Sequence, residues 1–216
     1  MNYSLLNLPL FQGLSRDDLL HIAEVVPLSF QQHKKGDVLS LVHEHCDKLI
    51  FVLYGKISVT MHANNNSYTL IEELHSPWMI EPEQLFGLQQ QYTRTYKAET
   101  NCNTLSIKKK HVLYLSEKHM VFHINLLNIL STQAQRLLQR AWQPAPTNLQ
   151  QRIIRFIKNR CLYPAGKKVF KIKMTQLAAL LNDSRLDISV ALNDLQSQQL
   201  IKLTRGHITV MALEKL

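Results

Sequence analysis

The residues with the clearest capacity for chemistry lie near the carboxyl end of the chain, between Ser184 and Asn193. Four side chains fall on the outward side of a predicted helix there: Arg185, Leu186, Ser189 and Asn193. The guanidinium group of Arg185 can donate to O6 and N7 of guanine together, and Leu186 can contact the methyl group of thymine. These residue types at this spacing predict a helix that reads base edges in the major groove of duplex DNA.

The elements that must position this helix are marked by apolar residues at three- and four-residue spacing. The first set is Leu177, Leu180 and Leu181, and the second set is Ile188, Ala191, Leu192 and Leu195. Asn182 and Asp183 interrupt the pattern, and asparagine tolerates the left-handed conformation that ends a helix. Ser184 is a good N-cap for the second helix. Two short helices joined by a tight turn predict a helix-turn-helix.

A β-hairpin with a cation at its tip is predicted directly after these helices. Leu200–Leu203 and His207–Val210 flank the turn at Arg205 and Gly206, which makes the motif a winged one. Contacts with backbone phosphates are expected from Lys171, Lys173 and, in the wing, Arg205. Thr175 and Ser184 are also predicted to bind DNA. The alternative is a helical hairpin without a nucleic acid partner, because the apolar pattern by itself reports only packing.

The distribution of charge favours the nucleic acid interpretation. Residues 1–125 carry 11 Lys and Arg against 12 Asp and Glu, whereas residues 126–216 carry 14 against 4. A solvated basic face is the simplest explanation of such an excess. Because the basic charge falls on the half with the winged helix-turn-helix, we expect a polyanionic partner, and double-stranded DNA is the first candidate.

Length and composition bound the class of protein. With 216 residues and 45% hydrophobic residues, the chain is long enough for two modest globular domains. Neither an export signal nor a membrane-spanning segment is indicated. The cysteines are Cys46, Cys102 and Cys161, an odd number at wide spacing, which favours buried or free thiols over a disulfide or metal framework. We therefore expect a cytoplasmic protein.

The amino-terminal half changes from a helical to a β-type pattern. Residues 1–30 are predicted to be helical, with an amphipathic helix after the N-cap Ser15. Short β-type runs follow at Val38–Leu41, Leu49–Leu53, Ile57–Met61, Tyr68–Ile71, Tyr92–Thr100 and Thr104–Ile107. Many short strands with turn residues between them predict an antiparallel barrel or jelly roll.

A long helix is predicted from about Glu117 to Trp142, with two apolar faces. One face contains Phe122, Leu126 and Ile129. The other face begins with Met120 and His123. The second face could meet a copy of itself in a two-stranded seam made by Leu127, Leu130, Ala134, Leu137 and Ala141. A helix covered by its own domain is the alternative, and we favour the homodimer. Gln143–Thr147, with two prolines, then predicts an interdomain hinge.

These elements predict an α+β protein of three parts. Residues 1–116 form a jelly-roll sensor domain, residues 117–143 a dimerisation helix, and residues 144–216 a winged helix-turn-helix DNA-binding domain.

In this order and spacing the chain resembles the CRP/FNR superfamily (catabolite activator and fumarate-nitrate regulator) of bacterial transcription factors. The resemblance is carried by Leu10–Ser15, Lys35–Leu39, Phe51–Val59, the long helix, and Leu177–Leu195 with its Ser184-Arg185 pair. It implies a cyclic-nucleotide-binding-type jelly roll and a ligand-responsive homodimer that binds a near-palindromic DNA site. It also implies RNA polymerase as a partner and an unidentified small-molecule effector.

Departures from the family pattern bear on the effector and on the operator. The resemblance places the effector pocket at Glu81, Glu83, Tyr92, Thr93 and Arg94. Tyr92 stands where cyclic-AMP-binding members have the arginine that grips the phosphate, so we expect that cyclic AMP is not the effector. The iron–sulfur branch needs a cysteine cluster, which the sequence lacks. Leu186 and Val190 replace a glutamate and an arginine of the family's recognition helix, so the operator should differ.

Two other functional readings stay open. His43-Glu-His45 is similar to the His-x-His of metal-dependent cupin enzymes, whose two imidazoles bind one ion. The carboxylate expected a few residues later is missing, and we favour a surface turn without a metal. A sensor that works only as a ligand-independent interaction module is the third reading. Because the sequence has no nucleophile elbow, phosphate-binding loop or paired zinc-ligand pattern, we predict a protein with no catalytic residues and no cofactor.

Overall fold

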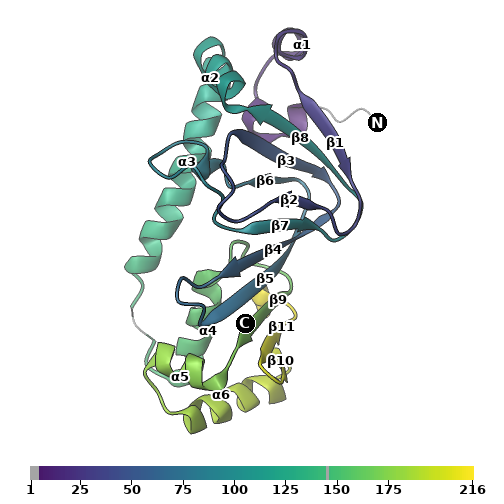
Figure 1. Cartoon of the computed structure of the whole chain (residues 1–216). Coiled ribbons are helices and arrows are strands. Elements are labelled where there is room, and N and C mark those ends of the chain that lie inside the picture. Colours follow the sequence, from purple (N-terminus) through teal and green to yellow (C-terminus); the bar gives the residue numbers. More distant parts are fainter. Residues whose placement is uncertain (1–4, 145) are drawn as a thin grey trace. The chain divides into compact units, whose positions relative to one another are not determined.

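The computed structural model describes residues 5–144 and 146–216, and the chain folds as two compact units (Figure 1). Unit 1 comprises residues up to 57, 75–93 and 97–142. Unit 2 comprises residues 58–74, 94–96 and 143–216. Each unit therefore combines segments that are far apart in the sequence. The predicted domain boundaries at residues 116 and 143 stay a proposal.

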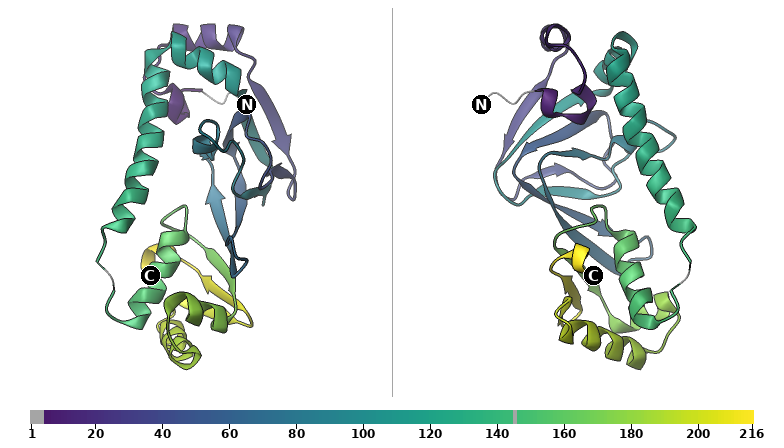
Figure 2. Two further views of the ribbon diagram at one scale, coloured as in Figure 1. Left: turned by 60° about the vertical axis from the view of Figure 1, so that its left-hand side comes forward. Right: turned by 180° about the vertical axis from the view of Figure 1, so that it is seen from behind.

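Unit 1 contains a four-stranded antiparallel sheet in the order β1-β8-β3-β6. These strands are β1 (Ser29–His33), β3 (Lys48–Tyr54), β6 (Trp78–Ile80) and β8 (Cys102–Lys108). The other strand and short helices are β2 (Val38–Ser40), η1 (Leu5–Asn7), η2 (Pro9–Phe11) and η3 (Pro82–Gln84). Its α-helices are α1 (Arg16–Val25), α2 (Lys109–Lys118) and α3 (Met120–Ala141), which Figure 2 shows from two sides. β7 (Thr95–Ala98) begins in unit 2 and ends in unit 1.

An aromatic cluster joins η2, β3 and α3 in the core of unit 1. The ring of Phe11 lies 5.4 Å from that of Phe122 and 6.4 Å from that of Phe51, between centroids. All three side chains are buried. The Asn125 amide also donates to the carbonyl oxygens of Leu10 and Gln12. One face of α3 is thereby fixed against the amino-terminal segment.

Unit 2 contains a sheet in which β10, β11, β9, β5 and β4 are successive neighbours. Its strands are β9 (Lys168–Ile172), β10 (Ile201–Thr204), β11 (His207–Val210) and most of β4 (Lys56–His62) and β5 (Tyr68–His75). The first two residues of β4 and the last residue of β5 belong to unit 1. Its helices are α4 (Leu149–Arg160), α5 (Met174–Leu181), α6 (Arg185–Ser197) and η4 (Leu213–Lys215). A hydrophobic core that includes the buried side chains Phe156, Phe170 and Leu192 holds them together.

The fold class is the predicted one, an α+β chain with a jelly-roll-like amino-terminal part and a carboxyl-terminal helix-turn-helix. The prediction of a helical segment over residues 1–30 was too broad, since within residues 5–30 the α-helix is limited to Arg16–Val25 and a strand begins at Ser29. β1 is exposed along nearly its whole length and pairs with β8 through its backbone. It therefore has no alternating apolar pattern from which it could be predicted.

The predicted helix from Glu117 to Trp142 is two helices. Glu117 belongs to α2, and His119 interrupts the chain in an extended conformation with φ −124° and ψ 97°. The imidazole of His119 lies 3.7 Å from the Asp18 carboxylate. His123, which was placed in the apolar stripe, faces the Ser116 carbonyl oxygen at 3.2 Å. Position 123 therefore serves the α2–α3 corner and not the seam.

Candidate nucleic-acid interface

The first helix of the predicted helix-turn-helix is α5. Leu177 and Ala178 are buried and Leu181 is half-buried, but Leu180 is 37% exposed, so its predicted place on the buried face was wrong. On a short helix, positions 177, 178 and 181 already cover the width of the core-facing stripe. Asn182 ends α5 in the left-handed conformation with φ 50° and ψ 55°, as predicted.

The second helix, α6, begins at the predicted N-cap. The Ser184 hydroxyl oxygen accepts from the Asp187 N–H at 3.1 Å and donates to the Asp187 carboxylate at 2.6 Å. The four predicted apolar positions of α6 are all buried: Ile188, Ala191, Leu192 and Leu195. Because this face is fixed in the core, the opposite face is left to solvent.

The outward face of α6 carries the predicted base-reading residues. Arg185, Leu186 and Asn193 are exposed, and Ser189 is half-buried. Leu186 has 73% of its surface exposed, and Val190 beside it has 53%. Large apolar side chains at this exposure on a polar helix face are suited to contacts with thymine methyl groups.

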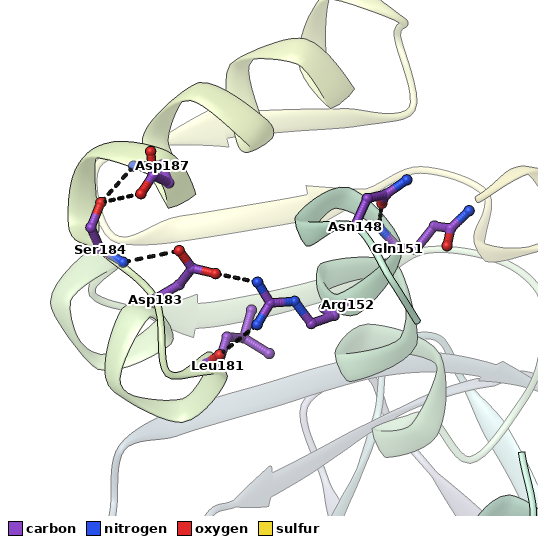
Figure 3. Close-up of polar contacts among 7 residues, drawn as sticks. All are labelled: Asn148, Gln151, Arg152, Leu181, Asp183, Ser184 and Asp187. Carbon is purple, nitrogen blue, oxygen red and sulfur yellow. Dashed lines mark hydrogen bonds and ion pairs between the residues drawn. The ribbon is translucent and has the colours of Figure 1, made fainter. Parts of the chain in front are cut away.

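A clamp from α4 holds the turn between α5 and α6, and Figure 3 shows its contacts. The Arg152 guanidinium donates to the Leu181 carbonyl oxygen at 3.1 Å and is paired with the Asp183 carboxylate. The other oxygen of Asp183 accepts from the Ser184 N–H at 3.1 Å. α4 is itself capped by Asn148, whose side-chain oxygen accepts from the Gln151 N–H at 2.8 Å. The entry to α6 is therefore fixed by charge-assisted hydrogen bonds.

The wing is the predicted hairpin. β10 and β11 pair from Ile201↔Val210 to Thr204↔His207, and Gly206 has the positive φ of 75° that this tight turn requires. Arg205 is exposed at the tip. The Ile172 N–H donates to the Gly206 carbonyl oxygen at 2.9 Å, which fixes the tip against the end of β9.

A cleft of about 480 Å³ separates the wing from the helices. The predicted residues that line it are Lys173, Thr175, Arg185 and Arg205, and His207 lines it as well. The predicted contacts Lys171, Ser184, Leu186, Ser189 and Asn193 are not part of its lining. Lys171 and Ser184 are nevertheless exposed. Three cations at one concave surface form a site suited to phosphate oxygens.

Sequence reasoning missed two residues of this region. Arg152 acts behind the turn, and its partner Asp183 is 31 positions away, so no local pattern reveals the pair. His207 was assigned only to the strand of the wing. Its ring nitrogen Nδ1 lies 2.9 Å from the Arg205 carbonyl oxygen, which places the imidazole at the tip.

The predicted dimer seam is a row of accessible residues on α3. Leu127, Ala134 and Leu137 are exposed and Leu130 is half-buried. The side chain of Ala141 and the hinge residue Ala145 lie outside the described residues. Leu137 and Leu138 are 64% and 65% exposed, and Trp142 is 86% exposed. Large apolar side chains along the described part of α3 are therefore exposed to solvent.

Of the predicted effector residues, Glu81 and Thr93 contact each other. The buried Glu81 carboxylate accepts from the Thr93 N–H at 2.7 Å and from the Thr93 hydroxyl at 3.1 Å. Tyr92 is buried and its hydroxyl donates to the Lys48 carbonyl oxygen at 3.3 Å. Burial raises the pKa of the Tyr92 phenol above its ordinary value. Glu83 is exposed, and Arg94 is half-buried in unit 2.

The His43-Glu-His45 segment forms a turn. His43 has a φ of 69°, and its N–H donates to the Tyr92 carbonyl oxygen at 2.8 Å. Among residues 5–144 and 146–216, no group of three or more His, Cys, Asp or Glu side chains is placed to hold a metal ion. All three cysteines are buried, and none of them forms a disulfide. In the same residues, no helix is long and apolar enough to cross a membrane.

Comparison with known proteins identifies the carboxyl-terminal part: residues 151–216 match the Crp-like helix-turn-helix domain family. No curated protein sequence matches the chain significantly.

Solved structures share the fold across nearly the whole chain. A transcriptional regulator from Eubacterium rectale, assigned to the Crp/Fnr family, has a TM-score of 0.55 at 19% identity, covering 96% of this chain and 95% of that one. The catabolite activator protein of Thermus thermophilus has a TM-score of 0.52 at 17% identity, with 96% and 95% covered. The c-di-GMP-responsive regulator CLP of Xanthomonas campestris has a TM-score of 0.50 at 14% identity, with 85% and 94% covered.

These comparisons confirm the resemblance inferred from the sequence. The chain has the fold of these solved CRP/FNR-type structures, and its residues 151–216 carry a Crp-like helix-turn-helix.

Proposed function

We propose that this chain is a sequence-specific DNA-binding transcription regulator of the CRP/FNR type that works as a homodimer. The observation that carries the proposal is the outward face of α6, with Arg185 at the basic cleft beside the wing. In this arrangement Arg185, Leu186, Ser189 and Asn193 read bases. The phosphate backbone is contacted by Lys171, Lys173, Thr175, Ser184 and Arg205.

The decisive experiment begins with selection of bound sequences from random duplex DNA. On the best site, Arg185→Ala is expected to cost about 1–3 kcal/mol and to relax the preference at one base pair. Lys173→Ala should weaken binding evenly across sequences and lower the salt dependence by about one phosphate contact. Lys158→Ala, on the exposed face of α4 and outside the cleft, is the matched control. Equal affinity and preference for wild type and Arg185→Ala would refute the assignment.

Dimerisation is supported by the exposed apolar row on α3. A parallel pair of α3 helices buries Leu127, Leu130 and Leu137 at one seam and presents two recognition helices to successive major grooves, about 34 Å apart on B-DNA. Leu137→Asp is expected to give a monomer in light scattering with much weaker operator binding. Asn128→Asp, an exposed polar position on the same helix, is the control. A Leu137→Asp protein that stays dimeric would remove this seam from the proposal.

The sensor part is proposed to respond to an effector other than cyclic AMP. Two observations support this. The Tyr92 hydroxyl donates to a backbone carbonyl oxygen, and the Thr93 N–H and hydroxyl both donate to the Glu81 carboxylate. A phosphate at Thr93 would therefore meet a buried negative charge. Calorimetric titration with cyclic AMP is expected to give no saturable heat, and micromolar binding would contradict the proposal.

The effector is a small molecule not identified by these residues, and RNA polymerase is the expected protein partner. As a regulator of bacterial transcription, the protein would act in the cytoplasm.

A further inference from the structure

The β4–β5 hairpin, from the amino-terminal half of the sequence, lies in the same compact unit as the winged helix. β5 pairs with β9 in antiparallel register from Tyr68↔Ile172 to Glu72↔Lys168. β9 in turn pairs with β11, and β11 with β10. The sheet that carries the wing therefore continues into the hairpin without a gap.

Apolar side chains of the hairpin complete the core of the winged helix. Leu70 stands opposite Phe170 in the ladder, both are fully buried, and both belong to the core that holds α6. The Tyr68 ring lies 5.6 Å from the Phe156 ring between centroids, and the Arg160 guanidinium covers Phe156 at 3.7 Å. Arg160 Nε also donates to the Tyr68 hydroxyl at 2.9 Å. Removal of the hairpin would expose this surface and leave β9 as an unpaired edge.

A buried ion pair closes the far end of the ladder. Lys168 Nζ lies 2.8 Å from Glu72 Oε2, and the two side chains are 0% and 3% exposed. The Glu72 carboxylate also accepts from the Leu162 N–H at 2.8 Å and approaches the Tyr163 N–H at 3.4 Å. Either charge alone at this depth would be strongly unfavourable, so each side chain requires the other segment to be docked.

We propose that the β4–β5 hairpin is a permanent part of the DNA-binding unit, and that through it the amino-terminal half sets the orientation of α6. A motion of the sensor that displaces the hairpin turns the winged helix with it, because ladder, core and ion pair move as one body. The effect on DNA binding rests on the proposed function, whereas the docking of the hairpin does not. The first two tests therefore need no DNA.

The first test joins the two strands covalently in the full-length chain. Ile71 and Val169 are directly opposite and half-buried, on the face away from the ion pair. Either type of antiparallel pair has a Cα separation within the range of a disulfide. Ile71→Cys/Val169→Cys is expected to form an intramolecular disulfide on oxidation, with Ile71→Cys alone as the control. A disulfide between two chains, or none, would overturn the pairing.

The second test removes the ion pair and follows amide hydrogen exchange of residues 168–172. Glu72→Ala leaves the Lys168 charge buried alone, and protection is expected to fall about a hundredfold. Glu72→Met/Lys168→Met replaces the charges by apolar side chains and should restore most of it. Glu99→Ala, which removes a carboxylate from unit 1, is the control. Unchanged exchange in Glu72→Ala would overturn the role of the ion pair.

Operator binding by the same proteins tests the coupling. Affinity should fall at least tenfold in Glu72→Ala, return in the double methionine variant, and stay within twofold when the engineered disulfide closes. If Glu72→Ala loses amide protection but keeps its operator affinity, the coupling is refuted. If closing the disulfide changes operator affinity tenfold, the hairpin is not permanently docked. If the wild type binds no DNA sequence, the proposed function fails while the exchange and disulfide results still decide the docking of the hairpin.

Discussion

Replacement of Arg152 by alanine tests whether the turn of the helix-turn-helix sets DNA affinity without contact with DNA. The guanidinium spans from α4 to the Leu181 carbonyl oxygen and the Asp183 carboxylate. It is 34% exposed and Asp183 is 18% exposed, so water partly screens the pair. The hydrogen bond to the neutral Leu181 carbonyl oxygen contributes about 1 kcal/mol to stability, and the screened ion pair with Asp183 contributes about the same. We therefore expect Arg152→Ala to lower the free energy of unfolding by about 2 kcal/mol.

The same figure limits the loss of affinity. DNA can restore the orientation of α6 at a cost no larger than the free energy that the clamp supplied, so binding should weaken by at most about 2 kcal/mol, or roughly 30-fold. Because Arg152 acts behind the turn, the slope of log affinity against log salt should not change. A phosphate contact would instead lower the slope by about 0.9.

Fluorescence anisotropy across a salt series, with urea unfolding of the same proteins, measures both quantities. Arg155→Ala is the matched control, because Arg155 lies on the same helix and donates to the carbonyl oxygens of Gln143 and Pro144 instead of the turn. A double-mutant cycle with Asp183→Ala isolates the pair itself. Lost stability with unchanged affinity would refute the positioning role, and a changed salt slope would show direct contact with phosphate.

Three further changes have expected outcomes. Ser184→Ala removes the N-cap of α6 and should cost about 1 kcal/mol in urea unfolding, whereas Ser197→Ala at the other end of α6 should cost a few tenths. Gln199 has a φ of 60°, a conformation that is strained for a residue with a side chain. Gln199→Gly should therefore raise the free energy of unfolding by about 0.5–1 kcal/mol. A lower free energy of unfolding would show that contacts of the Gln199 side chain outweigh this strain. Burial raises the folded-state pKa of both Cys46 and Tyr92. Their unfolded forms therefore release protons first, and stability should fall as the pH rises past 9.0 and then 10.0, the ordinary values. In Tyr92→Phe the second part of this loss should disappear, and an unchanged alkaline profile would contradict the assignment.

The elements that the sequence predicted well are those whose limits depend on local chemistry. Ser184 caps α6 through its own hydroxyl, Asn182 ends α5 through its tolerance of positive φ, and Gly206 turns the wing. Each of these effects acts within a few residues, so spacing along the chain was enough to find it. The outward face of α6 followed from the same periodicity.

The errors arise where distant segments decide the outcome. Leu180 fits the apolar period of α5, yet a short helix needs only a narrow face, and the core is closed by other elements. His119 interrupts the long helix at a corner where α2 and α3 change direction. The clamp at Arg152 and the pair of Glu72 with Lys168 join residues that are 31 and 96 positions apart. No pattern within a helix or strand carries information about such partners.

The burial of Lys168 changes how the basic charge of this chain should be understood. Lys168 was counted in the excess of residues 126–216, but it is fully buried and paired with Glu72, and Arg152 is paired with Asp183. These two cations hold the structure together and would contribute little to the electrostatic field at the proposed DNA-binding surface. The cations that remain at the cleft are few, namely Lys173, Arg185 and Arg205. Affinity should therefore depend on where these three lie more than on net charge, and removing any one should weaken binding more than removing an exposed lysine elsewhere on unit 2.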